Sequence, residues 1–108
     1  MSETSDALEL EVTNPGPHVI IRIAGEVDLA SSARLATTLD QFVNDGASTV
    51  TLDLSRVTFF DSSGIRVLVR ATHDLAETGH PLELATPSPA VRRVLEMAGV
   101  LDLFTVDG

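Results

Sequence analysis

Alternating apolar and polar positions predict two paired strands near the start of the chain. Residues 8–13 alternate strictly, which is the period of a strand with one exposed face. The turn-forming run Asn-Pro-Gly-Pro at 14–17 follows, and residues 19–23 are then nearly continuously apolar and β-branched. We therefore expect a hairpin whose second strand is covered on both faces and ends at Gly25.

Three later segments carry residues at the spacing of one helical face. These faces are Leu35, Leu39, Phe42 and Val43; Ile65, Leu68, Thr72 and Leu75; and Val91, Val94, Leu95 and Ala98. Strands are expected at 50–54, 82–84 and 103–106, and Ser88 followed by Pro89 is typical of a helix start.

The resulting order, β-β-α-β-α-β-α-β, predicts an α/β domain. We expect a mixed, mostly parallel sheet of about five strands with three to four helices. Residues 1–6 are expected to be a flexible N-terminus, and residues 7–108 to form the single domain.

The composition excludes several classes of site. The 108 residues include no cysteine, tryptophan or tyrosine, which removes disulfides, thiolate metal sites and aromatic platforms for nucleic-acid bases. Seven arginines and no lysine face sixteen carboxylates, and a net charge of −9 repels nucleic acid and anionic lipid. No apolar run approaches the length of a membrane span, and the polar, acidic start is unlike a secretory signal. We therefore expect a cytoplasmic protein that binds neither nucleic acid nor membranes.

No catalytic arrangement is recognisable around the histidines or serines. His18, His73 and His80 lie on separate segments without metal-ligand spacing, so we expect them on the surface. Ser63 lacks the GxSxG elbow of serine hydrolases, and the chain has no glycine-rich phosphate loop. The sequence predicts a protein that is not an enzyme and has no cofactor or metal site. A small hydrolase using Ser63 is a remote alternative.

A polar junction joins the strand at 50–54 to the helix that follows. It reads Asp61-Ser62-Ser63-Gly64, after the carboxyl end of a parallel strand, where α/β domains usually place function. One explanation is helix capping by Asp61 or Ser62, worth about 1 kcal/mol. The other is a functional loop, because glycine costs about 1 kcal/mol inside a helix and its missing side chain lets a partner approach Ser63.

A second acidic loop at 25–28 follows another sheet strand and could lie at the same end of the sheet. Asp28 also has an ordinary explanation as the N-cap of the first helix. On the second helix, Arg66 and Arg70 lie one turn apart, away from its apolar face. We expect Arg70 to pair with Asp74, whereas Arg66 could contact a partner or a phosphate.

Taken together, these segments resemble a STAS domain, and specifically the bacterial anti-sigma-factor antagonists. The resemblance rests on the order and spacing of the loop at 25–28, the strand at 52–54, the junction at 60–64 and the tail at 91–104. It implies the STAS fold and a regulator that binds an anti-sigma factor, itself a serine kinase, and so frees the sigma factor.

The resemblance also implies a modification site. The kinase would phosphorylate the residue directly before the glycine, which corresponds to Ser63, and so switch partner binding off. A metal-dependent serine/threonine phosphatase would reverse the mark, and Ser62 is the second candidate for modification. The residues expected to contact the partner are Asp28, Asp61, Ser62, Ser63, Gly64 and Arg66. Alternative roles for the same fold are a stressosome-like scaffold or an accessory subunit of a lipid ABC transporter.

Overall fold

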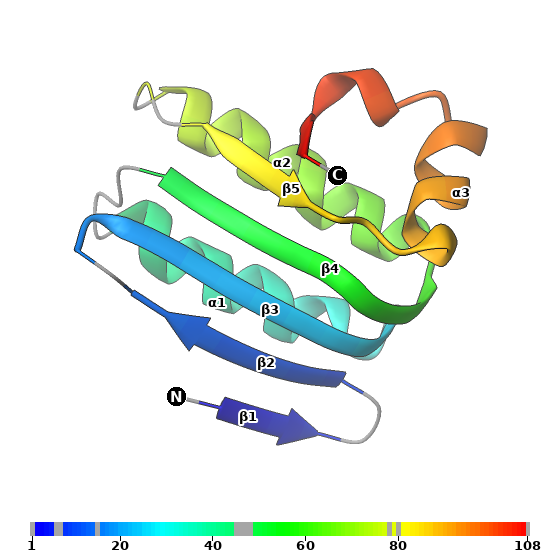
Figure 1. Cartoon of the computed structure of the whole chain (residues 1–108), viewed down its shortest axis with the longest axis horizontal. Coiled ribbons are helices and arrows are strands. Elements are labelled where there is room, and N and C mark those ends of the chain that lie inside the picture. Colours follow the sequence, from blue (N-terminus) through cyan, green and yellow to red (C-terminus); the bar gives the residue numbers. More distant parts are fainter. Residues whose placement is uncertain are drawn as a thin grey trace.

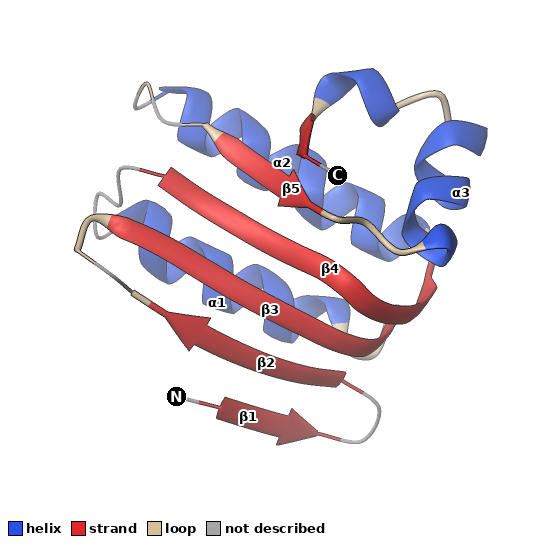
Figure 2. Ribbon diagram, in the orientation of Figure 1, coloured by secondary structure: helices blue, strands red, loops and turns tan. Residues whose placement is uncertain are grey.

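The computed structural model describes residues 2–5, 8–14, 16–44, 49–77, 79 and 81–107. Within them, six strands form one sheet, and helices follow three of these strands (Figure 1, Figure 2). The strands are β1 (Ser2–Ser5), β2 (Leu8–Thr13), β3 (His18–Val27), β4 (Thr49–Phe60), β5 (Leu82–Ala85) and β6 (Thr105–Asp107). The helices are α1 (Ser32–Asn44), α2 (Ser62–Glu77), α3 (Pro89–Met97) and the short 3₁₀ helix η1 (Leu101–Leu103). The predicted α/β class is confirmed.

The spatial order of the strands follows the chain, from β1 to β6. β1, β2 and β3 pair antiparallel, and β3 to β6 pair parallel. The predicted hairpin of β2 and β3 is confirmed, with Leu10 opposite Ile23. The sequence predicts no strand before Leu8, so β1 adds one strand to the expected order, within the segment expected to be a flexible end.

One face of the sheet is covered by α1 and α2, which lie behind the strands in Figure 1. The largest buried side chains lie between these two layers. They include Leu10, Ile21, Leu52 and Leu84 from the strands, and Leu35, Leu39, Leu68 and Leu75 from the helices. Burial of this apolar surface is the main favourable contribution to folding, and it fixes where each helix starts relative to the strand before it.

The opposite face of the sheet is polar and uncovered. Glu11, Arg22 and Asp53 stand side by side on three neighbouring strands. Arg22 Nη1 lies 3.5 Å from Glu11 Oε1, and Arg22 Nε lies 3.9 Å from Asp53 Oδ2. The prediction that β3 is covered on both faces is therefore wrong. Its β-branched run, 19–21, reflects the preference for a pleated, half-buried surface and not burial on both sides.

The sequence predicts that this strand ends at Gly25. In the structure β3 continues to Val27. Gly25 has a φ of +101°, a conformation that side chains disfavour. The register between β3 and β4 shifts between Gly25 and Glu26, which is a bulge that bends the strand without ending it. Beyond the bulge Val27 pairs with Phe60, so β3 and β4 end side by side.

β4 also extends beyond the predicted strand at 50–54. Ser55 and Arg56 interrupt the apolar alternation, but both are exposed, whereas Val57 and Phe60 are buried. The longer strand therefore carries Phe60 to the start of α2, where the candidate site lies.

Candidate functional site

The start of α2 is capped by Asp61. Its Oδ1 accepts a hydrogen bond from the backbone N–H of Ser63 at 2.9 Å. Its carbonyl accepts from the N–H groups of Gly64 and Ile65 at 3.0 and 3.2 Å. Of the two predicted capping residues, Asp61 is therefore confirmed. Ser62 is not the cap but the exposed first residue of the helix.

Gly64 is buried, and the space beside it belongs to the ring of Phe60. A Cβ atom on Gly64 would lie 2.5 Å from Cε1 and 2.6 Å from Cζ of that ring. The sequence predicts that this glycine admits a partner, but the group that approaches it is a side chain of the protein's own core. The contact fixes the first turn of α2 against the end of β4, and so fixes the position of Ser63.

Ser63 is the second residue of α2 and is half-buried, whereas the neighbouring Ser62 is exposed. Both hydroxyls lie at the end of the helix where the peptide N–H groups are free and the macrodipole is positive. An anion is stabilised at this position of a helix. The electrostatics of the first turn of α2 are therefore favourable for an anion.

The loop after β3 is closed by hydrogen bonds between Asp28 and Ser31. Asp28 Oδ1 accepts from the backbone N–H of Ser31 at 3.0 Å and lies 3.0 Å from the Ser31 hydroxyl. That hydroxyl accepts from the N–H of Asp28 at 3.0 Å and lies 2.9 Å from the carbonyl of Glu26. The backbone hydrogen bond from Ser31, with help from its hydroxyl, holds the pKa of Asp28 below its ordinary value.

Asp28 caps the turn that leads into α1, as the capping explanation supposed, because its carboxylate and its carbonyl accept from the N–H groups of Ser31 and Ser32. The helix begins at Ser32, directly after Ser31. The carbonyl of Asp28 accepts from the N–H of Ser32 at 2.8 Å, so Asp28 closes the turn that precedes the helix. The ionised carboxylate is thereby held in one place at the molecular surface.

The two acidic loops meet at one end of the sheet, as predicted. Glu26 pairs with Phe59 and Val27 with Phe60, so the loops that continue from β3 and β4 start next to each other. Sequence reasoning missed two exposed apolar side chains in this region. Leu29 is 78% exposed and Phe59 is 47% exposed. Strand alternation could have found Phe59, because neighbouring residues of a strand point to opposite faces and Phe60 is buried.

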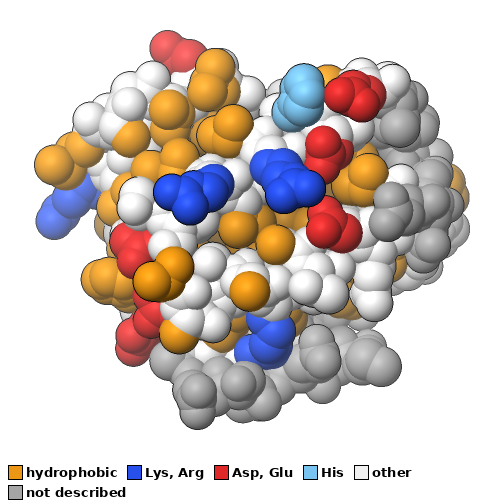
Figure 3. Space-filling view, turned by 180° about the vertical axis from the view of Figure 1, so that it is seen from behind, with side chains coloured by type: hydrophobic (Ala, Val, Ile, Leu, Met, Phe, Trp, Pro, Cys, Tyr) orange, Lys and Arg blue, Asp and Glu red, His pale blue; other side chains and the backbone are white. Residues whose placement is uncertain are grey.

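Both predicted arginines, Arg66 and Arg70, are exposed on α2. Arg70 Nε lies 3.9 Å from Asp74 Oδ2, so the predicted pair is present, although long and solvent-exposed. Arg66 is exposed one turn nearer to Ser63. In the middle of the face that Figure 3 shows, two cationic side chains lie among apolar side chains, and acidic side chains adjoin one of them.

The predicted surface histidines agree with the structure where it describes them. His18 and His73 are exposed, and His73 Nε2 lies 3.2 Å from Glu77 Oε1. His80 lies outside the described residues. In the part of the chain that is described, no cluster of three or more His, Cys, Asp or Glu side chains could hold a metal ion. No described helix is both long and apolar enough to cross a membrane.

Comparison with known proteins assigns the fold. The STAS domain family matches residues 9–107. BtrV of Bordetella bronchiseptica, provisionally named an anti-sigma factor antagonist, is 33% identical over 88 residues, which is 82% of this chain and 76% of BtrV.

Two solved structures of SpoIIAA extend the comparison. The anti-sigma factor antagonist SpoIIAA in its unphosphorylated form is 26% identical, with a TM-score of 0.77 over 94% of this chain and 89% of that one. The Bacillus cell fate determinant SpoIIAA in the phosphorylated form is 25% identical, with a TM-score of 0.72 over 94% and 92%. The family match over residues 9–107 and the similarity of the fold to these solved structures point to the same family. The chain belongs to the STAS domain family.

Proposed function

We propose that this protein is an anti-sigma-factor antagonist controlled by phosphorylation of Ser63. Its unphosphorylated form binds an anti-sigma factor, which is also a serine kinase, and so releases the sigma factor. The observation that carries the proposal is the start of α2. There Ser63 directly precedes Gly64, which packs on Phe60, and its N–H donates to Asp61. The acidic loop after β3 starts beside the end of β4. The names of BtrV and SpoIIAA support it, as does the existence of SpoIIAA in both phosphorylation states.

The proposed contact surface consists of the two loops and the first turns of α2. Its residues are Asp28, Asp61, Ser62, Ser63, Gly64 and Arg66. Within this set, Gly64 acts indirectly, since it is buried and positions Ser63 through Phe60. The acidic loops favour a partner with a basic docking surface.

Phosphorylation of Ser63 changes the charge of this surface and leaves the core unchanged. A phosphate adds about −1.5 to −2 charges and three acceptor oxygens. The Asp61 carboxylate already accepts from the Ser63 N–H, and the Asp28 carboxylate is held ionised in the neighbouring loop. The bulk of the phosphate and the cost of desolvating it therefore weaken the binding of a partner that packs against this surface. Regulatory coupling of this kind is worth about 1–3 kcal/mol, or about 5- to 150-fold in affinity.

In this cycle the protein is a substrate and a binding partner, and it supplies no chemistry of its own. The anti-sigma kinase adds the phosphate, and a metal-dependent serine/threonine phosphatase removes it. The cycle runs in the cytoplasm, where transcription is controlled.

Intact-mass measurement of the protein from its native cells, in growth and in stress, tests the modification. We expect a phosphate that fragmentation places on Ser63 and whose occupancy changes with the condition. A phosphate on Ser62 would keep the switch and overturn the site. A chain without phosphate in every condition would overturn the switch and favour a scaffold or transporter-subunit role.

Binding of the purified anti-sigma factor tests the consequence. We expect calorimetry to show that Ser63→Ala binds the anti-sigma factor with the affinity of the unmodified protein. Ser63→Asp should bind it much more weakly. Thr105→Asp is the matched control, because it adds the same charge at an exposed residue outside the proposed contact surface. Equal affinities for Ser63→Ala and Ser63→Asp would contradict the proposal.

A further inference from the structure

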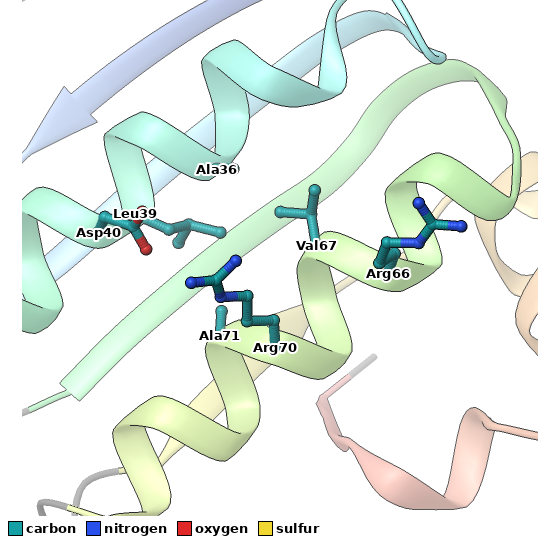
Figure 4. Close-up of a pocket in the computed structure, with 7 residues that line it drawn as sticks. All are labelled: Ala36, Leu39, Asp40, Arg66, Val67, Arg70 and Ala71. Carbon is teal, nitrogen blue, oxygen red and sulfur yellow. The ribbon is translucent and has the colours of Figure 1, made fainter.

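A groove between α1 and α2 lies beside the surface described above (Figure 4). Its floor is apolar and its rim is charged. Ala36, Leu39, Val67 and Ala71 form the floor, and Asp40, Arg66 and Arg70 form the rim. In Figure 4, Leu39 and Val67 reach from the two helices into the gap, and the Arg70 guanidinium extends from α2 toward α1.

The size of the groove restricts its occupant. Its volume is about 200 Å³, below the roughly 300–1,000 Å³ of pockets that enclose a whole small molecule. A space of this size accommodates one or two apolar side chains of a protein segment that lies along the surface.

The charge of the rim also restricts which partner can occupy the groove. The chain has a net charge of −9, yet two of its seven arginines stand one turn apart on this rim. The Arg70–Asp74 pair is 3.9 Å long and the Arg70 side chain is 78% exposed, so the pair is weak and its guanidinium remains available. Among the described residues, Arg66 has no ion-pair partner within 4.0 Å. Both guanidinium groups therefore suit carboxylates from outside.

We propose that this groove binds an acidic, amphipathic segment of the anti-sigma factor, an inference that rests on the proposed function. One or two apolar side chains of the segment fill the floor, and flanking carboxylates pair with Arg66 and Arg70. The acidic loops at Asp28 and Asp61 face the basic part of the same partner. The opposite polarities of loops and groove allow the partner to dock in only one orientation.

The groove also connects with the modification at Ser63. Arg66 lies three residues after Ser63, and residues at this spacing are neighbours on a helix surface. Its guanidinium points toward the amino-terminal end of α2 in Figure 4. A phosphate on Ser63 therefore competes with the partner's carboxylate for Arg66, so phosphorylation weakens the contact at the groove.

Charge reversal at the rim tests the groove. Calorimetry with the purified anti-sigma factor compares the wild-type chain with the double variant Arg66→Glu/Arg70→Glu. We expect affinity to fall about 10- to 100-fold, as for loss of charge pairs across an interface. The matched control is Arg56→Glu/Arg93→Glu, which makes the same charge change at two exposed arginines that do not line the groove. A third variant, Ala36→Met, fills the floor from α1 without changing charge and should also weaken binding.

The outcomes separate this inference from the proposed function. The groove is not the site if the double variant binds the anti-sigma factor as tightly as the wild-type chain does. It is also not the site if the control variant loses as much affinity as the double variant. If the wild-type chain binds no anti-sigma factor, the proposed function fails and the assigned occupant fails with it. Circular dichroism checks that each variant is folded. Hydrogen exchange on the wild-type complex should show new protection in α1 and α2 around the groove, and unchanged exchange there would also overturn the proposal.

Discussion

The loops after β3 and β4 start side by side, yet they use their aspartates differently. After β3, Asp28 bonds to Ser31 and closes the loop on itself before α1 begins. After β4, Asp61 caps α2 and bonds only to backbone N–H groups, so the hydroxyls of Ser62 and Ser63 are left for other partners. The first loop is therefore a fixed surface, whereas the second leaves the hydroxyl of Ser63 at the position where we propose modification.

The largest expected effect comes from the packing that holds the second loop. Gly64→Val places side-chain atoms in the ring of Phe60, and overpacking of a core typically costs about 1–3 kcal/mol. We expect a loss of about 2 kcal/mol in the free energy of unfolding, measured by urea denaturation. The double variant Gly64→Val/Phe60→Leu should recover part of this loss. No recovery would show that the two residues are not coupled.

A smaller effect is expected from the cap itself. Asp61→Ala removes the acceptor for the Ser63 N–H and should cost about 1 kcal/mol in the same assay. Asp61→Asn is the matched control, because asparagine is an equally good N-cap and should retain most of the stability. If Asp61→Asn were as destabilising as Asp61→Ala, the negative charge and not the hydrogen bond would be responsible.

The pH dependence of Asp28 tests whether the first loop is closed as described. Because the pKa of Asp28 is lowered by folding, its contribution to stability is present above the ordinary value of 3.8. The contribution is lost as pH falls below 3.8 through the lower pKa of the folded state. Asp28→Asn should therefore be less stable than the wild-type chain at pH 7, and the difference should shrink at pH 3. Glu26→Gln, two residues earlier at the end of β3, is the control, and a difference in stability that does not depend on pH would argue against the closed loop.

The smallest effect on stability is expected at the exposed Leu29. Its side chain is 78% exposed, so Leu29→Ser should change the free energy of unfolding by less than about 0.5 kcal/mol. Binding of the anti-sigma factor should nevertheless weaken, since an exposed apolar side chain that a partner covers contributes the free energy of its burial. Met97→Ser, at an equally exposed residue on α3, is the control. Equal binding by both variants would place Leu29 outside the interface.

The helices and the hairpin could be predicted because their signals are local. Helical spacing located α1 and α2, and Ser88 starts α3 as expected, with its Oγ accepting from the Val91 N–H at 3.3 Å. The meeting of the two acidic loops also followed from the order of elements, since parallel strands place their carboxyl ends together.

The remaining features depend on how strands pair and how side chains pack, which the pattern of apolar and polar residues does not encode. The bulge at Gly25 is visible only in the register of β3 against β4. Likewise, a glycine in a polar junction suggests access for a partner, whereas the ring of Phe60 fills that space. The uncovered face of β3 was missed because its β-branched residues satisfy strand propensity whether one face or both are buried.

The uncovered sheet face is also a convenient position for a spectroscopic reporter. Because the chain contains no cysteine, Glu11→Cys would carry the single thiol of the protein and accept one fluorophore. Glu11 is exposed on the side of the sheet away from α1 and α2, and its ion pair with Arg22 is a weak surface pair. A dye at this position leaves the start of α2 and the groove unobstructed, so fluorescence polarisation could follow assembly of the complex, and its reversal by phosphorylation, in real time.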